Sequence, residues 1–387
     1  MEKNNREDRK KQMNTEIIYI VCEILSVLFM AIAQNSYNKT EEIVTKKLVI
    51  RKSSIFFVLS VLPFAILFWC RGISVGADYQ NYTNIYQKIA NDTLIGREAD
   101  WIGIGFQLIC RFLSIFCGNN FYLAFAIVNT VTLVLLYKTI WQNSKNPTLA
   151  LFVLLSFCLH FQIFNQFRQM LAIAITFFAV KYLKSENFIK YSICIIIAAL
   201  IHNTAIVLLP CYFICHNKLN KRMIIFYVLA LLVCTFGFSI IESLLSGTYY
   251  GQMYFGGKYD IQTDSSIMNL IVRIMMLIIV LLFYKKVIKH DETNVILYNM
   301  VIICTIAQIV ATQSYIFARL TTYFYIYYVL LIPEVMKVAI KKGISKQIAN
   351  MIIIIILIVY QFVYYNSSSG AIGGGYDEYR TIWQDKH

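Results

Sequence analysis

The sequence predicts an all-α, polytopic membrane protein with about 11 to 12 membrane helices in one membrane domain, residues 1–387. Of its 387 residues 58% are hydrophobic and only 14% are charged, whereas soluble domains are about 25% charged and about half apolar. Apolar runs of about 17 to 25 residues recur, and each is long enough to cross about 30 Å of hydrocarbon. No soluble domain of ordinary size fits between these runs.

The apolar runs place the membrane helices along the chain. The run 189–215 is too long for one crossing and carries "IHNTA" at its centre, so it predicts two short helices that meet at a turn near His202. The candidate spans are 17–33, 53–70, 121–140, 148–164, 168–184, 189–215, 222–245, 267–287, 294–314, 319–338 and 347–365.

The net charge of +14 comes from lysines and arginines in alternate short loops. Cytoplasmic loops retain such residues, so this pattern orients the protein and argues against binding to nucleic acid. The opposite loops are poor in lysine and rich in tyrosine, glycine and asparagine. They include an outer loop 71–120, an outer loop 246–266 and an outer C-terminal tail 366–387.

Two segments do not fit a simple alternation of loops. "WIGIGFQLICRFLSIFCG", with Arg111 in its middle, would reverse every later loop if it crossed, so we interpret it as an interfacial or re-entrant helix on the outer side. The N-terminal "MEKNNREDRKKQMNTE" is basic, yet the alternation places it outside. Either translation starts at Met13, or the first span is not a full crossing.

Charged residues within or at the ends of spans are expensive in lipid, by about 2.5 kcal/mol or more near the centre, and therefore mark candidate functional sites. A lone arginine at a helix end ordinarily snorkels to the headgroups. That explanation is weaker for Arg168 and Arg319, which lie on the side that otherwise avoids positive charge. The polar residues predicted at the outer ends of spans are Arg71, Asp78, Arg168, His202 and Arg319.

Guanidinium groups bind phosphates bidentately and stay charged at every relevant pH. Arginines gathered with a histidine and tyrosines at the outer face suit a lipid-linked pyrophosphate. The 27 tyrosines are typical of a membrane-interface belt and also offer faces on which sugars stack. The loop 246–266 and the tail could contact sugar or could be plain flexible connections.

Four stretches in the same order carry a resemblance to a known family: "RGISVGADYQNY", "FNQFRQMLAIAITFFAVKYL", "IAALIHNTAIVLLP" and "FARLTTYFYIYYVLLIP". Over about residues 50 to 335 the chain resembles the EpsG family of Wzy-like polysaccharide polymerases, with a C-type glycosyltransferase-like fold. The resemblance implies that repeat units linked to undecaprenyl pyrophosphate are joined on the outer face of the bacterial cytoplasmic membrane, in capsule, exopolysaccharide or O-antigen synthesis. It also implies a flippase and a chain-length regulator as partners.

The reaction assigns a role to each predicted site residue. Arg168 and Arg319, with Arg71 as a third candidate, would stabilise the negative charge of the departing pyrophosphate. Asp78 or His202 would deprotonate or orient the acceptor hydroxyl. Gly76 would let the loop turn close to the substrate. The remaining predicted substrate-binding residues are Tyr79, Tyr82, Gln169 and Tyr323.

The sequence shows no acidic DxD motif and no cysteine spacing of a metal site, so no metal or other cofactor is expected. Two other kinds of protein remain as alternatives. A flippase or transporter for a lipid-linked sugar would show internal repeats and polar residues at mid-membrane. An O-antigen ligase would use the same donor with another acceptor, and an O-acetyltransferase of the same pathway would place its histidine on the cytoplasmic side.

Overall fold

The computed structural model is 82% helix and confirms an all-α membrane protein. Arg71 and Thr381 form an isolated antiparallel bridge, and no strand occurs in the ranges described. Most of the loop 246–266 and residues 367–373 of the tail lie outside those ranges. The structure describes residues 2–40, 52–94, 102–238, 240, 243–244, 247, 265–313, 315–339, 344–366 and 374–384.

Four helical segments of this described part are long and apolar enough to cross a membrane: Asn14–Asn38, Lys52–Cys70, Phe121–Asn143 and Glu292–Ala311. Shorter apolar helices of 10–17 residues accompany them. Large apolar side chains on several helices are exposed, among them Ile24, Val233 and Phe362. Such surfaces are typical of helices that face lipid, where no water is available to penalise them.

The chain divides into two compact units. The first contains residues 1–178, 196–203 and 350–387. Its elements are α1 (Glu2–Thr40), α2 (Lys52–Cys70), α3 (Tyr79–Ala90), α5 (Ile104–Cys117), α6 (Phe121–Asn143), α7 (Pro147–Ser156), α8 (Gln162–Asn165), α9 (Phe167–Phe178), the end of α11 (Phe188–Ile201) and most of α21 (Ile344–Tyr365).

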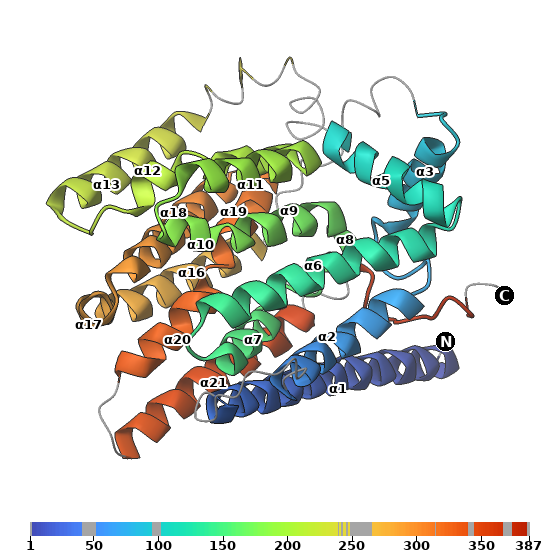
Figure 1. Ribbon diagram of the computed structural model, residues 1–387, viewed down its shortest axis with the longest axis horizontal. Coiled ribbons are helices and arrows are strands. Elements are labelled where there is room, and N and C mark those ends of the chain that lie inside the picture. Colours follow the sequence, from blue (N-terminus) through green and yellow to red (C-terminus); the bar gives the residue numbers. More distant parts are fainter. Residues whose placement is uncertain are drawn as a thin grey trace. The chain divides into compact units, whose positions relative to one another are not determined.

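Helices α1 and α2 run side by side in the first unit (Figure 1). α2 also packs on α6, where the Trp69 indole donates a hydrogen bond of 2.7 Å to the Thr130 hydroxyl. α1 is tied to α7 because Gln34 Oε1 accepts hydrogen bonds from both the amide and the hydroxyl of Thr148, at 3.1 and 2.6 Å. These polar ties fix helix positions where a lipid environment supplies no hydrophobic force between helices.

The second unit contains residues 179–195 and 204–349. Its most buried long helix is α18, and the polar side chain of Asn299 is fully buried there. Asn299 accepts a 2.7 Å hydrogen bond from the Tyr227 hydroxyl and donates to the carbonyls of Cys215 and Asn217 at 2.7 and 2.9 Å. The elements are α10 (Val180–Lys184), the start of α11, η1 (Asn203–Leu208), α12 (Cys211–Cys215), α13 (Lys221–Phe236), α16 (Ser265–Leu282), α17 (Tyr284–His290), η2 (Glu292–Asn294), α18 (Val295–Ala311), α19 (Tyr315–Tyr325) and α20 (Tyr328–Ala339).

Asparagine side chains cap the N-termini of three helices. Asn120, Asn146 and Asn220 each accept a hydrogen bond from the amide three residues ahead, at 3.2, 3.1 and 3.0 Å, at the starts of α6, α7 and α13. Each bond satisfies an amide that has no partner within its helix. The predicted turn near His202 is confirmed, since α11 ends at Ile201 and η1 begins at Asn203.

Several predicted spans are broken rather than continuous. The prediction 148–164 becomes α7, a turn and α8, and 168–184 becomes α9 and α10. The spans 267–287 and 319–338 are likewise divided, into α16 with α17 and α19 with α20. The backbone at Cys158 has φ 55°, the left-handed conformation that no α-helix continues through. Mean hydropathy follows composition and cannot detect such breaks.

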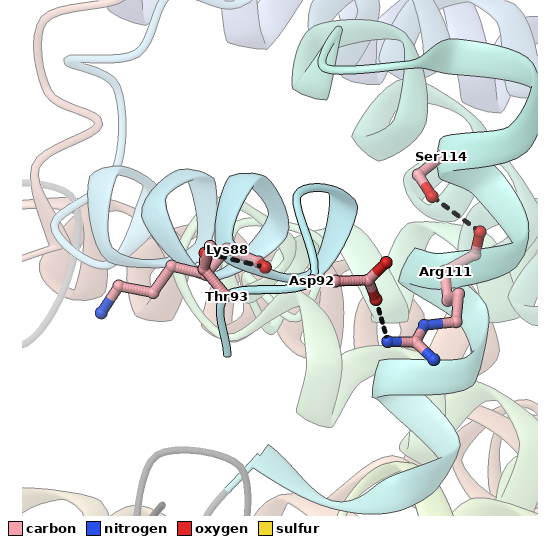
Figure 2. Close-up of polar contacts among 5 residues, drawn as sticks. All are labelled: Lys88, Asp92, Thr93, Arg111 and Ser114. Atoms are coloured by element: carbon pink, nitrogen blue, oxygen red, sulfur yellow. Dashed lines mark hydrogen bonds and ion pairs between the residues drawn. The ribbon is translucent and has the colours of Figure 1, made fainter. Parts of the chain in front are cut away.

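Helix α5 forms within the segment predicted to be interfacial. Ile104, Leu108, Phe112, Ile115 and Phe116 are all more than half exposed, and their spacing places them along one side of the helix. Arg111 forms an ion pair with Asp92 at the end of α3, and both side chains are exposed (Figure 2). Arg111 is therefore a surface residue, and its helix has the amphipathic character expected at a membrane surface.

Candidate active site

Arg71 lies at the end of α2 in an aromatic cluster and is completely buried. Its guanidinium carbon is 3.5 Å from the ring centroid of Tyr79 and 5.3 Å from that of Phe164. Burial lowers the pKa of Arg71, while Tyr79 opposes that shift. An arginine starts from so high a value that it remains charged, so this is a desolvated cation held by cation–π contacts.

The loop that begins at Arg71 is bound by the C-terminal tail. The amide of Gly72 donates to the carbonyl of Arg380 at 2.7 Å, and Gly76 and Ala77 donate to Gly375 and Gly374 at 2.7 and 2.9 Å. The end of α2 takes part as well, because the amide of Ile382 donates to the carbonyl of Cys70 at 2.9 Å. The described part of the tail is thus an ordered strap along this loop.

Two side chains of α1 and a main-chain carbonyl of α2 hold the strap from the other side. The Tyr19 hydroxyl donates to the carbonyl of Tyr376 at 2.8 Å, and the amide of Tyr379 donates to the hydroxyl of Thr15 at 3.0 Å. The Tyr379 hydroxyl donates to the carbonyl of Leu67 at 2.8 Å. The start of α1, the end of α2 and the tail therefore meet at one end of the first unit (Figure 1).

Gly76 lies at the closest approach of this loop to its neighbours. Its φ of +95° is unfavourable for any residue with a Cβ atom. A Cβ atom would also stand 2.5 Å from the carbonyl oxygen of Phe164 and 2.9 Å from Oδ1 of Asn165. Asn165 in turn donates a 2.7 Å hydrogen bond to the carbonyl of Gly374. The loop, the turn before α9 and the tail consequently converge on Gly76.

Arg168 is in the first turn of α9 and is 6% exposed. Its Nη1 donates a hydrogen bond to the carbonyl of Ile102, which precedes α5. Gln169 beside it is also buried. The ring of Tyr82 on α3 packs 4.4 Å from the ring of Phe167. Three predicted site residues therefore lie together around the start of α9: Tyr82, Arg168 and Gln169.

The residues on both sides of His202, Leu200 and Asn203, approach the same segment that Arg168 contacts. His202 is half-buried, and its amide donates to the carbonyl of Ala198 at 2.8 Å. Gly103, with φ +81°, follows Ile102, and a Cβ atom there would stand 3.1 Å from the carbonyl of Leu200 and 3.5 Å from Oδ1 of Asn203. Because residue 103 is a glycine, this close contact is possible. The turn at His202 therefore lies beside Gly103, and the preceding residue, Ile102, binds Arg168.

Asp78 and Tyr79 begin α3. Asp78 is half-buried, and its main-chain carbonyl accepts a 3.2 Å hydrogen bond from the amide of Tyr82. In the first unit the structure therefore places two groups of predicted residues: Arg71, Gly76 and Tyr79 under the tail, and Tyr82, Arg168 and Gln169 near the turn at His202. Helix α3 connects the two groups, with Asp78 at its start.

The other two predicted residues belong to the second unit. Arg319 is half-buried on α19, and Tyr323, one turn later, is fully buried. The Thr204 hydroxyl donates to that of Tyr323 at 3.5 Å, a long hydrogen bond. In this unit Arg273 of α16 is also buried, and its guanidinium lies 4.3 Å from the ring centroid of Tyr325. The approach of Arg319 to Arg168 stays a prediction.

One polar cluster was not predicted as part of a site. Glu23 of α1 and the fully buried His160 form an ion pair with 3.2 Å between Oε1 and Nε2. Gln361 of α21 donates a 2.5 Å hydrogen bond to the other oxygen of Glu23. Glu23 and His160 lie within the predicted spans 17–33 and 148–164, but 137 positions separate them (160 − 23), and their pairing has no signature along the chain.

The described residues contain no group of three or more histidine, cysteine, aspartate or glutamate side chains that could hold a metal ion. All ten cysteines are free. The site is therefore built of arginines, tyrosines, amides, a histidine and a carboxylate. Such a set can bind phosphate and sugar hydroxyls and can transfer a proton.

Among the comparisons with known proteins, one family model matches most of the chain. No curated protein and no solved structure matches it. The model of the EpsG family matches residues 54–381, which extend from α2 to the tail residue that bridges to Arg71. EpsG is a family of Wzy-like polymerases of polysaccharides. Because the match covers most of its length, this chain is a member of the EpsG family.

Proposed function

We propose that this protein joins oligosaccharide repeat units carried on undecaprenyl pyrophosphate, on the outer face of the bacterial cytoplasmic membrane. The family supports a membrane-bound polysaccharide polymerase. The observation that carries the finer proposal is that Arg168 binds the carbonyl of Ile102 while the turn at His202 packs on the adjacent Gly103. Arg168 and the turn that carries His202 therefore contact the same segment, Ile102 and Gly103.

In the proposed reaction an acceptor hydroxyl oxygen attacks the anomeric carbon of the donor sugar. The bond from that carbon to the bridging phosphate oxygen breaks, and undecaprenyl pyrophosphate departs with the electron pair. Arg168 and Arg319 stabilise the charge that builds on the phosphate, with Arg71 as a third cation. The proton of the acceptor passes to His202 or Asp78. Tyr79, Tyr82, Gln169 and Tyr323 orient the substrate.

Arg168 is already oriented to act in this way. Its Nη1 already has a partner in the carbonyl of Ile102, which fixes the direction of the guanidinium before substrate arrives. A guanidinium carries five donors, so it can bind a phosphate while it keeps a hydrogen bond to a carbonyl. Preorganised cations lower a barrier because they need not reorient when the charge develops. The tie to Ile102 is thus compatible with catalysis.

The test replaces Arg168, His202 and Arg319 singly with alanine in cells that depend on this protein for polymer. Loss of one such group is expected to lower polymer synthesis by about 100-fold or more. Arg111→Ala is the matched control, because that arginine is exposed and paired with Asp92. Protein levels in the membrane are measured for every variant. Long polymer in all three variants would refute the proposed site.

A second assay separates the alternative functions. Purified protein is given a single kind of lipid-linked repeat unit, and the products are resolved by size. A ladder of products identifies a polymerase. One transfer to a foreign acceptor identifies a ligase, and movement across the bilayer without a new covalent bond identifies a transporter. The flippase and the chain-length regulator expected as partners are not needed in this assay.

A further inference from the structure

A groove runs along α1, between that helix, α7 and α21. It consists of two adjoining cavities of about 340 and 420 Å³. Both are lined by Glu23, Ile24, Phe152 and Gln361, so the two cavities lie end to end along α1. The groove extends along α1 from Glu16 to Ala31, which at 1.5 Å per residue is about 22 Å. That length is a large part of the hydrocarbon thickness of a bilayer.

The walls of the groove are mostly apolar and reach the surface of the first unit. Ile24, Ile358 and Phe362 line it and are 59%, 50% and 68% exposed. Phe152 and Leu155 of α7 form its inner wall. A hydrocarbon chain in this space would cover these side chains and make dispersion contacts along its whole length. The groove therefore suits a long, unbranched or isoprenoid chain from the membrane.

The end of the groove at Tyr19 lies beside the tail strap that bridges to Arg71. Tyr19 lines the groove, and its ring lies 6.2 Å from that of Tyr379 and 6.3 Å from that of Tyr365. The Tyr19 hydroxyl donates to the carbonyl of Tyr376 in the strap, and Thr381 of the same strap bridges to Arg71. A lipid whose chain occupies the groove would present its headgroup at the end of the unit that holds this cation.

From these relationships we infer that the groove binds the polyprenyl chain of the lipid-linked substrate. The inference rests on the proposed function, because it assigns the chain of that substrate to this groove and its diphosphate to the end where Arg71 lies. Ordinary phospholipids also have hydrocarbon chains. The strap that contacts both Tyr19 at the end of the groove and the buried Arg71 favours the substrate, since a diphosphate has the stronger demand for a desolvated guanidinium.

Glu23 and Gln361 act as positioning residues for this groove. Their 2.5 Å hydrogen bond ties α21 to α1 where the two cavities join, so it sets the width of the groove. The carboxyl group of Glu23 also lies 3.2 Å from Nε2 of the fully buried His160. A hydrocarbon chain in the groove would therefore meet a carboxyl group that already has polar partners.

The test uses a polyprenyl diphosphate with a diazirine near the far end of its chain. The full-length protein is placed in nanodiscs of phosphatidylethanolamine and phosphatidylglycerol, photolysed, and digested for mass spectrometry. Labels are expected on α1 between Ile20 and Ala31, on α7 and on α21. Unlabelled polyprenyl diphosphate should suppress them, and an equal excess of phosphatidylglycerol should not. Labels confined to other helices, or equal suppression by phosphatidylglycerol, would overturn the inference.

Two matched variants sharpen the result. Ile24→Trp fills the groove and should lower the labelling of α21 about tenfold. Ile17→Trp is the control, because Ile17 is on the same helix, is 54% exposed and does not line either cavity. The wild-type label map decides the question if Ile24→Trp does not fold. Polymer synthesis is scored separately: labels in the groove with polymer retained by Arg168→Ala, His202→Ala and Arg319→Ala refute only the proposed site.

Discussion

The guanidinium of Arg71 lies against the ring of Tyr79, 3.5 Å from its centroid, and both side chains are buried. The contact places a permanent positive charge on an aromatic face under the C-terminal tail. A flat guanidinium can stack on the ring and still direct its N–H groups sideways, whereas an ammonium cannot. Substitutions of Arg71 can therefore show whether activity requires only its positive charge or also the planar shape of its guanidinium.

Replacement of Arg71 tests that distinction. Arg71→Lys keeps the charge but loses the planar stacking, and we expect it to lower polymer synthesis about tenfold. Arg71→Ala should lower it by about 100-fold or more, because a phosphate-binding cation is lost. The measurement is polymer per unit of protein in the membrane. Equal activity of Arg71→Lys and the wild type would show that stacking is unimportant.

Gly76→Ala should destabilise the first unit. The new Cβ atom would lie 2.5 Å from the carbonyl oxygen of Phe164 at a φ of +95°, and we expect a loss of about 3 kcal/mol or more. Gly118→Ala is the control, because its φ is also positive, +55°, but no atom lies within 4 Å. That variant should lose only about 1–2 kcal/mol. Thermal unfolding of purified protein in detergent measures both, and equal losses would contradict the close contact at Gly76.

Removal of Glu23 should be far more damaging than removal of an exposed ionic partner. Glu23→Ala leaves the fully buried His160 without its partner, which in a buried pair costs about 3–5 kcal/mol. Lys218 and Glu292 are 3.0 Å apart but 57% and 73% exposed, so Lys218→Ala should cost less than about 1 kcal/mol. The comparison is made by thermal unfolding. Similar midpoints for the two variants would mean that Glu23 and His160 contribute little.

The attachment of the tail should depend on pH through Asp377. Partial burial raises the pKa of this carboxyl above its ordinary value. The folded state then binds its proton more tightly than the unfolded state, so this group favours the docked tail at low pH. That contribution is lost as the pH rises through the raised pKa.

Limited proteolysis of the tail measures this dependence. Cleavage of wild-type protein should become faster as the pH is raised above the ordinary titration range of an aspartate, about pH 4, beyond the change in the protease itself. Asp377→Asn removes the titrating group and should show no such change, while Glu378→Gln next to it serves as the control. A wild-type profile that follows Asp377→Asn would exclude a role for this carboxyl.

Much of this architecture could be predicted from the sequence. Runs of apolar residues determine that helices form in a bilayer, because the backbone has no other partner there. The turn at His202 was predicted because one run was too long for one crossing. The breaks between α9 and α10 and between α19 and α20 were missed, because the residues on both sides of each break are equally apolar.

The residues of the candidate site could be predicted from the sequence, but the contacts between them could not. Charges within apolar runs pointed to Arg71, Arg168 and His202. The partner of Arg168 is the main-chain carbonyl of Ile102, and a carbonyl is present at every position of a chain. The glycines at 103 and 105 were the available signal, since a Cβ atom at either would approach the backbone of Leu200 to within 3.1 Å.

The tail is attached to the loop after α2 chiefly through amides and carbonyls, from Gly72 to Ala77 on one side and from Gly374 to Arg380 on the other. These groups are the same whatever side chain a residue carries. Homologues could therefore exchange the outward-facing residues of this strap for others and keep it fastened, which leaves these side chains free to diverge as the polymer made by each organism changes.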